Sequence, residues 1–505
     1  MSAASIALNR FGLGARPDQP LSGDPRAWLT GQIGRFDPRP SLIAAAPSRA
    51  AIAGELAQYL NEIRPMLQAQ RRAEGMVDRQ PQGQRSDAAM PGAESMAPSV
   101  AMTGKADEAP DPVKQARRFV GRQGRDYYAT LVGARANVAI QSDTPFMERL
   151  VHFWANHFAV SADKLTVVGM AGLLEFEAIR PNLTRSFGAM LSAVERHPAM
   201  LLYLDQAASI GPNSTVAQRV GRFAPNRKLG LNENLAREIM ELHTLGVRTG
   251  YSQADVTEFA RAMTGFTVAG LNRGPIARFA GTGGSPGDFV FAAPIHEPGA
   301  RTIMGKRYGQ SGEAQAQAVL DDLAVHPATA HHIATKLARH FAGDTPPPAM
   351  ITRLETAFLR SNGDLPTLYR ALIASPEAWA DAPVKFKSPW EWTLSSMRAL
   401  GLRDVPAPQL TGALIQLGQP VWRPGSPAGY DDIAGSWAGP DAVMRRVEIA
   451  QRLAQRAGNA VDARSLAPTL FPDAVSPSTR TVLTNADSPG QALALLLLAP
   501  EMMRR

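Results

Sequence analysis

The sequence predicts a mainly α-helical fold, an irregular multi-helix body with one small β-hairpin and a disordered insertion. Apolar residues recur at three- and four-residue spacing in PRAWLTGQIGRF, TPFMERLVHFWANHFAV, SQADVTEFARAMTGF and DAVMRRVEIAQRLAQRA, which is the period of an amphipathic helix. Four apolar helices end in a small residue or His followed by Pro, in SAVERHPAML, DDLAVHPATA, ALIASPEAWA and LLLLAPEMM. Pro suits the first turn of a new helix, so each of these marks a helix–Pro–helix corner. Their spacing is too irregular for a repeat array.

The helical body is predicted to be interrupted once near its N-terminus. Residues 1–65 read as N-terminal helices of the main body. Residues 66–116 are polar, aperiodic and rich in Pro, Gly and Ala, a composition typical of a flexible insertion. Residues 117–505 return to helical periodicity and form the rest of the main body.

Two irregular segments are expected within that body. Residues 288–308, DFVFAAPIHEPGARTIMGKRY, contain two short strand patterns around a turn carrying Pro298 and Gly299, which predicts a β-hairpin. Residues 403–440 are rich in Pro, Gly and Trp and are expected to form a long surface loop with buried anchors.

Composition excludes several classes of protein. The 505 residues are 45% hydrophobic and 19% charged, as in an ordinary soluble globular protein, and no apolar run reaches the roughly 18 residues of a membrane span. The net charge is +8, yet no Lys/Arg block has interleaved aromatics, so no nucleic-acid partner is expected. The absence of cysteine excludes disulfides, thiolate metal sites and cysteine nucleophiles. The segment MSAASIALNRFGLGARP lacks the pattern of a signal peptide, which favours a cytoplasmic location.

The most polar helix expected is LGLNENLAREIMELHTLG, residues 229–246. At about 100° per residue, one face carries Asn234, Arg237, Glu238, Glu241 and Thr244. Two adjacent carboxylates could share a proton or bind a divalent cation, whereas His243 faces away from them and is expected to pack. The alternative is a surface helix held by ion pairs.

A second polar stripe runs along residues 146–158, where Glu148, His152 and Asn156 follow one another at four-residue spacing. His157 falls among the apolar residues of this helix and is expected to be a hydrogen-bonded core histidine. A solvated helix face is the alternative for the other three.

A third stripe, in AHHIATKLARHF, gathers His332, Lys336, Arg339 and His340. Such a cationic face could hold a phosphate, sulfate or carboxylate, or it could simply pair with the acidic helix. His296, expected at the hairpin turn, could reach a neighbouring site.

Together these segments resemble a bacterial family, the domain of unknown function 1800 family. The matching motifs include ALNRFGLGARP, ERLVHFWANHFAVS, LNENLAREIMELHTLGV, YSQADVTEFARAMTGFT, ATKLARHF and VKFKSPWEW, in the family's order. The resemblance implies a mostly helical protein, often encoded beside a protein of the domain of unknown function 1501 family. Because that neighbour resembles sulfatases and alkaline phosphatases and usually carries an export signal, the resemblance implies an envelope or periplasmic setting and a shared anionic or glycan substrate.

These observations lead to one main hypothesis, an envelope-associated enzyme, dependent on a metal or on acid–base chemistry, that acts on an anionic or glycan substrate. The expected catalytic residues are Glu238, Glu241, His152, Asn156 and Arg237, and the expected binding residues are Asn234, Lys336, Arg339 and His296. A divalent metal, if bound, would be held by Glu148, His152 and Glu238. The alternatives are a non-catalytic partner or scaffold of the phosphatase-like neighbour, and a glycan-binding protein that uses the tryptophans between residues 390 and 437.

Overall fold

The computed structural model describes residues 1–21, 23–60, 112–223, 229–271, 283–383 and 385–505. The flexible insertion predicted for residues 66–116 lies outside the described residues, except for its last five. Those five begin a long helix, α6 (Pro112–Gln141).

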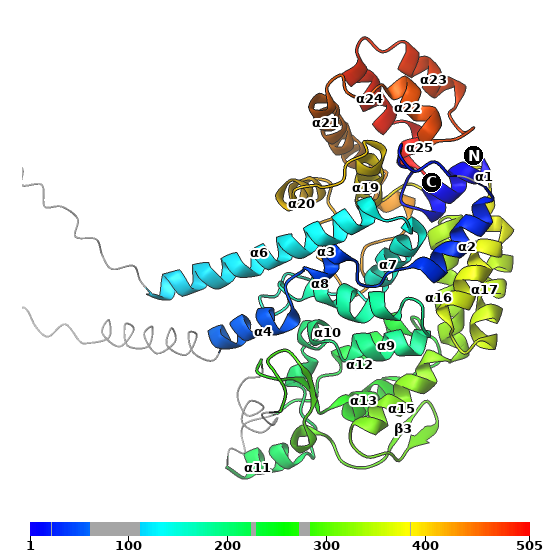
Figure 1. The fold of residues 1–505 in the computed structure, drawn as a ribbon. Helices are drawn as coiled ribbons and strands as arrows, with labels where there is room; N and C mark the ends of the chain where they lie inside the picture. Colours follow the sequence, from blue (N-terminus) through cyan, green and yellow to red (C-terminus); the bar gives the residue numbers. More distant parts are fainter. Residues whose placement is uncertain (22, 61–111, 224–228, 272–282, 384) are drawn as a thin grey trace, which may run out of the picture.

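Helices make up most of the described chain, which confirms the predicted fold class (Figure 1). The first part contains α1 (Ala3–Ile6), η1 (Ala7–Phe11), α2 (Pro25–Arg35), α3 (Ser41–Ala44), α4 (Arg49–Gln58), α6, α7 (Pro145–His157), α8 (Ala171–Leu173), η3 (Leu174–Ile179), η4 (Arg180–Asn182), α9 (Phe187–Glu195), α10 (Pro198–Tyr203), η5 (Gln206–Ala208) and α11 (Thr215–Phe223). The middle contains α12 (Asn234–Glu238), η6 (Ile239–His243), α13 (Gln253–Met263), β1 (Phe266–Val268), β2 (Phe289–Phe291), η7 (Ala293–Ile295), β3 (Arg301–Ile303), β4 (Lys306–Tyr308), α15 (Glu313–Ala324), α16 (Pro327–Ala342), α17 (Pro348–Arg360), α18 (Leu365–Ala374) and η8 (Pro376–Trp379). The last part contains α19 (Pro389–Ala399), α20 (Ala407–Gln416), η9 (Ala434–Ser436), α21 (Pro440–Ala457), α22 (Ala463–Leu470), α23 (Pro477–Thr484), α24 (Pro489–Leu497) and α25 (Pro500–Met503).

The helix–Pro–helix corners occur where the sequence predicts them. Four elements, α10, η8, α16 and α25, each begin at the proline of one corner motif. In two of these corners the preceding histidine caps the new helix: His197 accepts from the N–H of Ala199, and His326 from that of Ala328. These imidazoles satisfy backbone donors that a helix start leaves without a partner.

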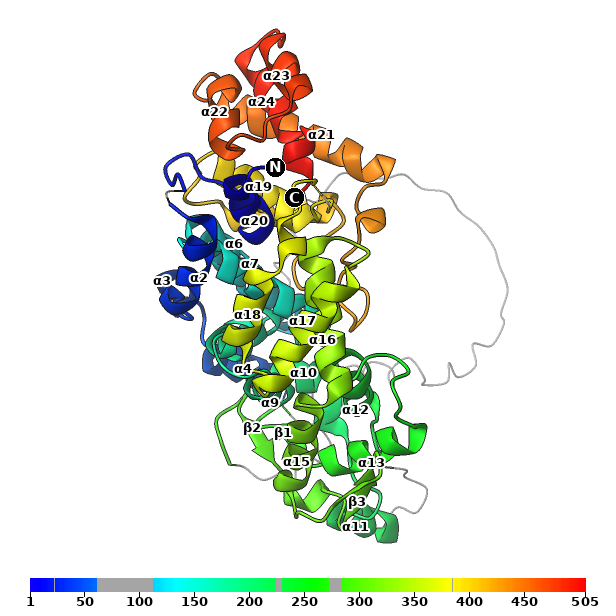
Figure 2. The ribbon, with the colours of Figure 1, turned by 90° about the vertical axis from the view of Figure 1, so that its right-hand side faces the viewer.

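The body is elongated, with the C-terminal helices α21–α24 at one end and the β-strands with α11, α13 and α15 at the other (Figure 2). One large hydrophobic cluster runs through most of the molecule, and a second joins the C-terminal helices to Leu8 of η1 and Trp392 of α19. The two termini lie close together beside α19 (Figures 1 and 2). The N-terminal segment therefore helps to attach the C-terminal helices to the main body.

The strands are paired differently from the predicted 288–308 hairpin. Strand β2 pairs antiparallel with β1, and β3 pairs with β4, which gives two separate two-stranded sheets. The aromatic pair Phe266–Phe289, with ring centroids 5.0 Å apart, joins β1 to β2. The second hairpin turns at Met304 and Gly305, which both have positive φ, rather than at Pro298 and Gly299.

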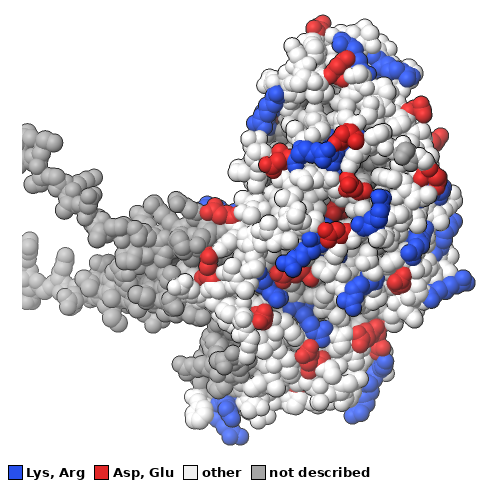
Figure 3. Space-filling model, viewed as in Figure 1, with Lys and Arg blue, Asp and Glu red and all other residues white. Residues whose placement is uncertain are grey.

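The segment predicted as a loop at residues 403–440 contains a helix, α20, which packs on α6 and α19. The part after α20 is irregular apart from η9, and its Tyr430 is hydrogen-bonded to Asn156 of α7. None of the helices in the described part of the chain is long and apolar enough to cross a membrane. On the face seen in Figure 3, acidic and basic side chains are interspersed.

Candidate functional site

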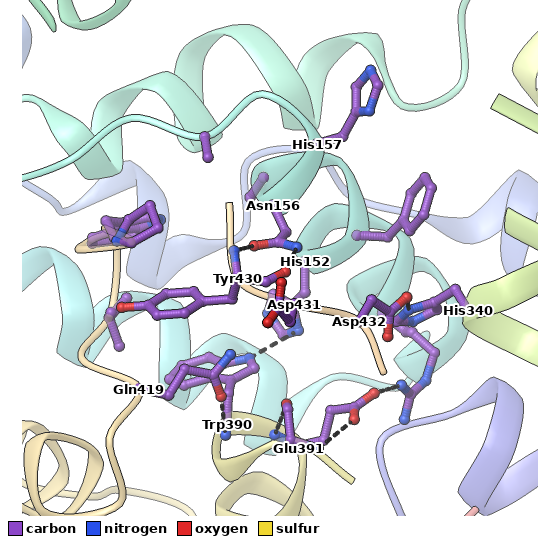
Figure 4. A pocket seen from close by; sticks show the side chains of 18 of the residues that line it. His152, Asn156, His157, His340, Trp390, Glu391, Gln419, Tyr430, Asp431 and Asp432 are labelled. Carbon is purple, nitrogen blue, oxygen red and sulfur yellow. Dashed lines mark hydrogen bonds and ion pairs between the residues drawn. The ribbon is translucent and has the colours of Figure 1, made fainter. Parts of the chain in front are cut away.

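A pocket with a volume of about 110 Å³ lies between α7, α16, α19 and the loop that follows α20. Four residues from the predicted stripes line it, namely His152, Asn156, Lys336 and His340. Figure 4 shows His152 and Asn156 beside Trp390 of α19 and Tyr430 of the loop. We call residues 417–433 the covering loop.

Asn156 fastens the covering loop to α7. Its amide nitrogen donates to the carbonyl of Tyr430 at 2.8 Å, and its amide oxygen accepts from the N–H of Tyr430 at 2.7 Å. Gly429, at φ +83°, permits this close approach, because a Cβ there would lie 2.3 Å from the carbonyl oxygen of Asn156. The side chain of Asn156 therefore positions the loop.

His152 has one ring nitrogen in use and one without a partner. The indole N–H of Trp390 donates to its Nδ1 at 3.2 Å. An indole can only donate, so Nδ1 accepts and the neutral ring carries its proton on Nε2. In the part of the chain that the structure describes, this buried Nε2 has no hydrogen-bond partner. Burial, reinforced by Arg135 and Arg149, holds the pKa of His152 well below its usual value, so the ring is neutral at physiological pH.

Lys336 reaches the pocket from α16 and donates to Nδ1 of His157 at 3.0 Å. His157 is almost fully buried, and its Nε2 donates to the carbonyl of His243 at 3.0 Å, as expected for a core histidine. Burial lowers the pKa of Lys336 to about 8, against the attraction of Asp432. At pH 7 about a tenth of this amine is therefore uncharged.

Three carboxylates line the pocket, and two of them, Glu391 and Asp432, are held in ion pairs. The third, Asp431, accepts from the hydroxyl of Ser436 at 2.7 Å. Glu391 pairs with Arg149 and, at 2.9 Å, with Arg505, and Asp432 pairs with Lys385 at 2.9 Å. Burial alone would raise the pKa values of both carboxyl groups. Arg505 and Arg149 nevertheless hold the pKa of Glu391 well below its usual range, and His340 and Lys385 do the same for Asp432. Both remain ionised and fix the shape of the pocket wall.

The aromatic wall is built around Arg135 of α6, which sequence reasoning missed. Its guanidinium lies over the rings of Trp390 and Trp422, 4.5 and 5.2 Å from their centroids, and pairs with Glu175 at 2.8 Å. The indole of Trp422 also donates to Glu175 at 3.2 Å. The WRPGSPAGYDD segment indicated part of this wall, because a Trp and a Tyr close together in a loop are expected to pack against a residue of the main body.

The acidic helix predicted as the centre of the site does not line this pocket. It is α-helical only over α12 and continues as the π-turn η6, whose end meets α7 where His157 donates to His243. Arg237 pairs with Glu233 at 3.2 Å, and Asn234 is exposed. Glu238 and Glu241 are half-buried, and burial raises the pKa of Glu238.

His243 lies at the end of η6 and is fully buried. Its Nδ1 is 2.8 Å from a carboxylate oxygen of Glu195, which is also fully buried. As expected from its position on the helix, it belongs to the packing.

The remaining predicted residues lie elsewhere. Glu148 forms a buried two-point ion pair with Arg180, at 2.7 and 2.9 Å. His296 is bonded to the carbonyl of Thr264 at 2.8 Å, and Arg339 is half-buried on α16 beside Lys336 without lining the pocket. Among the described residues no three His, Asp or Glu side chains are arranged to hold a metal ion.

The fold and motifs of this chain define a class of mainly helical protein with a covered polar pocket. A family model described as a protein of unknown function (DUF1800) matches residues 6–504. The chain belongs to this family, as its motifs predicted. No curated protein and no solved structure matches it.

Proposed function

We propose that this protein is an enzyme that acts by acid–base catalysis on a small anionic or sugar-like substrate in the pocket beneath the covering loop. The observation that carries the proposal is that Lys336 and His152 line one pocket, and that the buried Nε2 of His152 has no hydrogen-bond partner among the described residues. Titratable groups with shifted pKa values that converge in a cleft are typical of catalytic sites.

The two groups suit complementary roles. With a pKa of about 8, Lys336 has enough free amine at neutral pH to accept a proton from a substrate. His152 is neutral and offers an N–H, so it would donate a hydrogen bond to a substrate oxygen on which negative charge develops. Trp390, Trp422 and Tyr430 provide ring surface for the substrate's less polar side.

The ionisation of Lys336 can be tested without a substrate. We would label the protein with trinitrobenzenesulfonate over a range of pH and quantify modified Lys336 by mass spectrometry. The labelling rate of Lys336 should rise with a midpoint near pH 8. A midpoint for Lys336 near 10.5 would remove the basis for its role as a base.

Turnover is tested with a mixture of small acids and oligosaccharides followed by mass spectrometry. We expect the wild-type protein and a Lys306→Met control to consume a compound that Lys336→Met and His152→Gln leave unchanged. If all four proteins behave alike and remain folded, the pocket is not catalytic.

A second candidate is a non-catalytic scaffold for a partner such as the phosphatase-like neighbour implied by the family resemblance. It is favoured by the exposed position of Asn234 and the half-exposed position of Arg237, outside the pocket. In that case Glu238→Gln would weaken capture of the co-expressed neighbour, and His152→Ala would change only thermal stability.

A further inference from the structure

A larger groove, with a volume of about 790 Å³, lies between α19, α20 and α21, away from the polar pocket. Its floor and sides are mainly apolar and include Met397, Val405, Ile449 and Leu453. Binding sites for small molecules commonly have volumes of about 300–1,000 Å³ and a mostly apolar lining with a few polar groups. The groove has the size and lining of such a site.

The groove lies where two hydrophobic clusters meet, and most of the buried residues of its two flanking helices belong to different clusters. Leu410 and Leu414 of α20 pack in the large central cluster, whereas Ile449 and Ala450 of α21 pack in the C-terminal one. Helix α20 rests on α6, and α21 rests on α24. The space between them is therefore left open by the packing on either side.

Positive charge is concentrated along one edge of this groove. Arg452 and Arg456, both exposed and one helical turn apart on α21, are among the lining residues. Each guanidinium contacts a neutral glutamine, Gln416 and Gln409 respectively. Within the described ranges neither has a carboxylate partner within 4.0 Å, whereas the acidic lining residue, Asp404, accepts from Asn137 at 2.8 Å.

We infer that this groove binds a free fatty acid or a similar single-chain anionic amphiphile. The chain lies against the apolar residues of α19, α20 and α21, and the carboxylate lies at Arg452 and Arg456. This site is distinct from the acid–base pocket, and the inference does not depend on the proposed function.

The test measures binding of saturated fatty acids of 8 to 16 carbons by displacement of a fluorescent fatty acid, below their micelle concentrations. Affinity should rise about fourfold for each added methylene until the groove is filled, since each buried CH₂ contributes about 0.8 kcal/mol. The corresponding alcohols should bind about 3- to 10-fold more weakly, because they lack the charge that faces the two arginines.

Two variants test the binding of the alkyl chain and the binding of the carboxylate separately. Gly412 of α20 lines the groove, and a Cβ at this position would meet nothing within 4 Å, so Gly412→Leu should fill the groove without disturbing the fold and weaken acids and alcohols alike. Arg452→Gln with Arg456→Gln should weaken the acids about 3- to 10-fold and leave the alcohols unchanged. Gly34→Leu on α2 and Arg445→Gln on α21 are matched controls that do not line the groove.

Three results would overturn the inference. Binding that does not saturate, or that is equal in Gly412→Leu and the wild-type protein, would exclude a ligand in the groove. Equal losses for acids and alcohols in the arginine variant would exclude a carboxylate at α21. Sedimentation with phosphatidylglycerol vesicles but no binding of free fatty acid would make the groove a membrane contact instead.

Discussion

The strongest test of the packing beside the pocket is the replacement of Lys387 by Met. Lys387 is 1% exposed, and its ammonium nitrogen has no hydrogen-bond partner in the described part of the chain. Burial and then the positive charge of Arg149 lower its pKa to about 7, although Glu391 opposes the change. Folding therefore removes a proton from a lysine that would hold it in the unfolded chain.

The size of the effect follows from the two pKa values. A folded-state pKa of about 7 against 10.5 in the unfolded chain costs at most about 4 kcal/mol of stability at pH 7. Between pH 7 and 10.5 the unfolded chain binds more protons than the folded one, so the free energy of unfolding rises with pH across this window. At pH 9.5 the remaining cost is about 1 kcal/mol. Methionine fills a similar volume without a charge.

Lys387→Met should therefore be more stable than the wild-type protein by up to about 4 kcal/mol at pH 7. Its advantage should shrink to about 1 kcal/mol at pH 9.5. Urea unfolding at both pH values measures this difference, with Lys306→Met, at an exposed lysine, as the control. The reasoning is refuted if Lys387→Met is less stable at pH 7, or if its advantage is the same at both pH values.

Three further predictions concern stability and the covering loop. Glu148→Gln should lower the free energy of unfolding in urea by about 3–5 kcal/mol, because it leaves Arg180 buried without its anion. Gly429→Ala should speed proteolysis within the covering loop at unchanged far-UV circular dichroism, since the added methyl group meets the carbonyl of Asn156. Burial lowers the pKa of His332 to about 4. Between pH 6.5 and 4 the unfolded chain therefore binds a proton at His332 that the folded chain does not. Stability should fall by at most about 3 kcal/mol as the pH drops through this window, and His332→Gln should reduce that fall in acid titrations.

The sequence predicted helices well because their signals are local. Three- and four-residue periodicity and the prolines of the corner motifs both act within one or two turns of the chain. The pairing of β2 with β1 could not be predicted in the same way, because the partner strand lies beyond the neighbouring turn and the alternation within a strand does not identify it. The helix in the 403–440 segment was hidden by the Pro and Gly content around it.

The acidic helix illustrates a different limit of sequence reasoning. A regular helix was assumed from Asn234 to Thr244, but residues Ile239–His243 form a π-turn in which the hydroxyl of Thr244 donates to the carbonyl of Ile239. The wider turn rotates the residues that follow, so Thr244 is buried instead of sharing the polar face. Such a turn depends on tertiary packing, which periodicity does not contain.

The contacts of the polar residues on α7 show which of them is a candidate for chemistry. Their spacing places Glu148, His152 and Asn156 on one face of the helix, yet the three side chains have different hydrogen-bond partners. Both oxygens of Glu148 are taken by Arg180, and both ends of the Asn156 amide are taken by the backbone of Tyr430. Of these three, only His152 keeps a polar atom without a partner among the described residues, and His152 lines a pocket that also holds the titratable amine of Lys336. Unused hydrogen-bonding capacity, which no helical projection can reveal, therefore distinguishes the chemical candidate from its two structural neighbours.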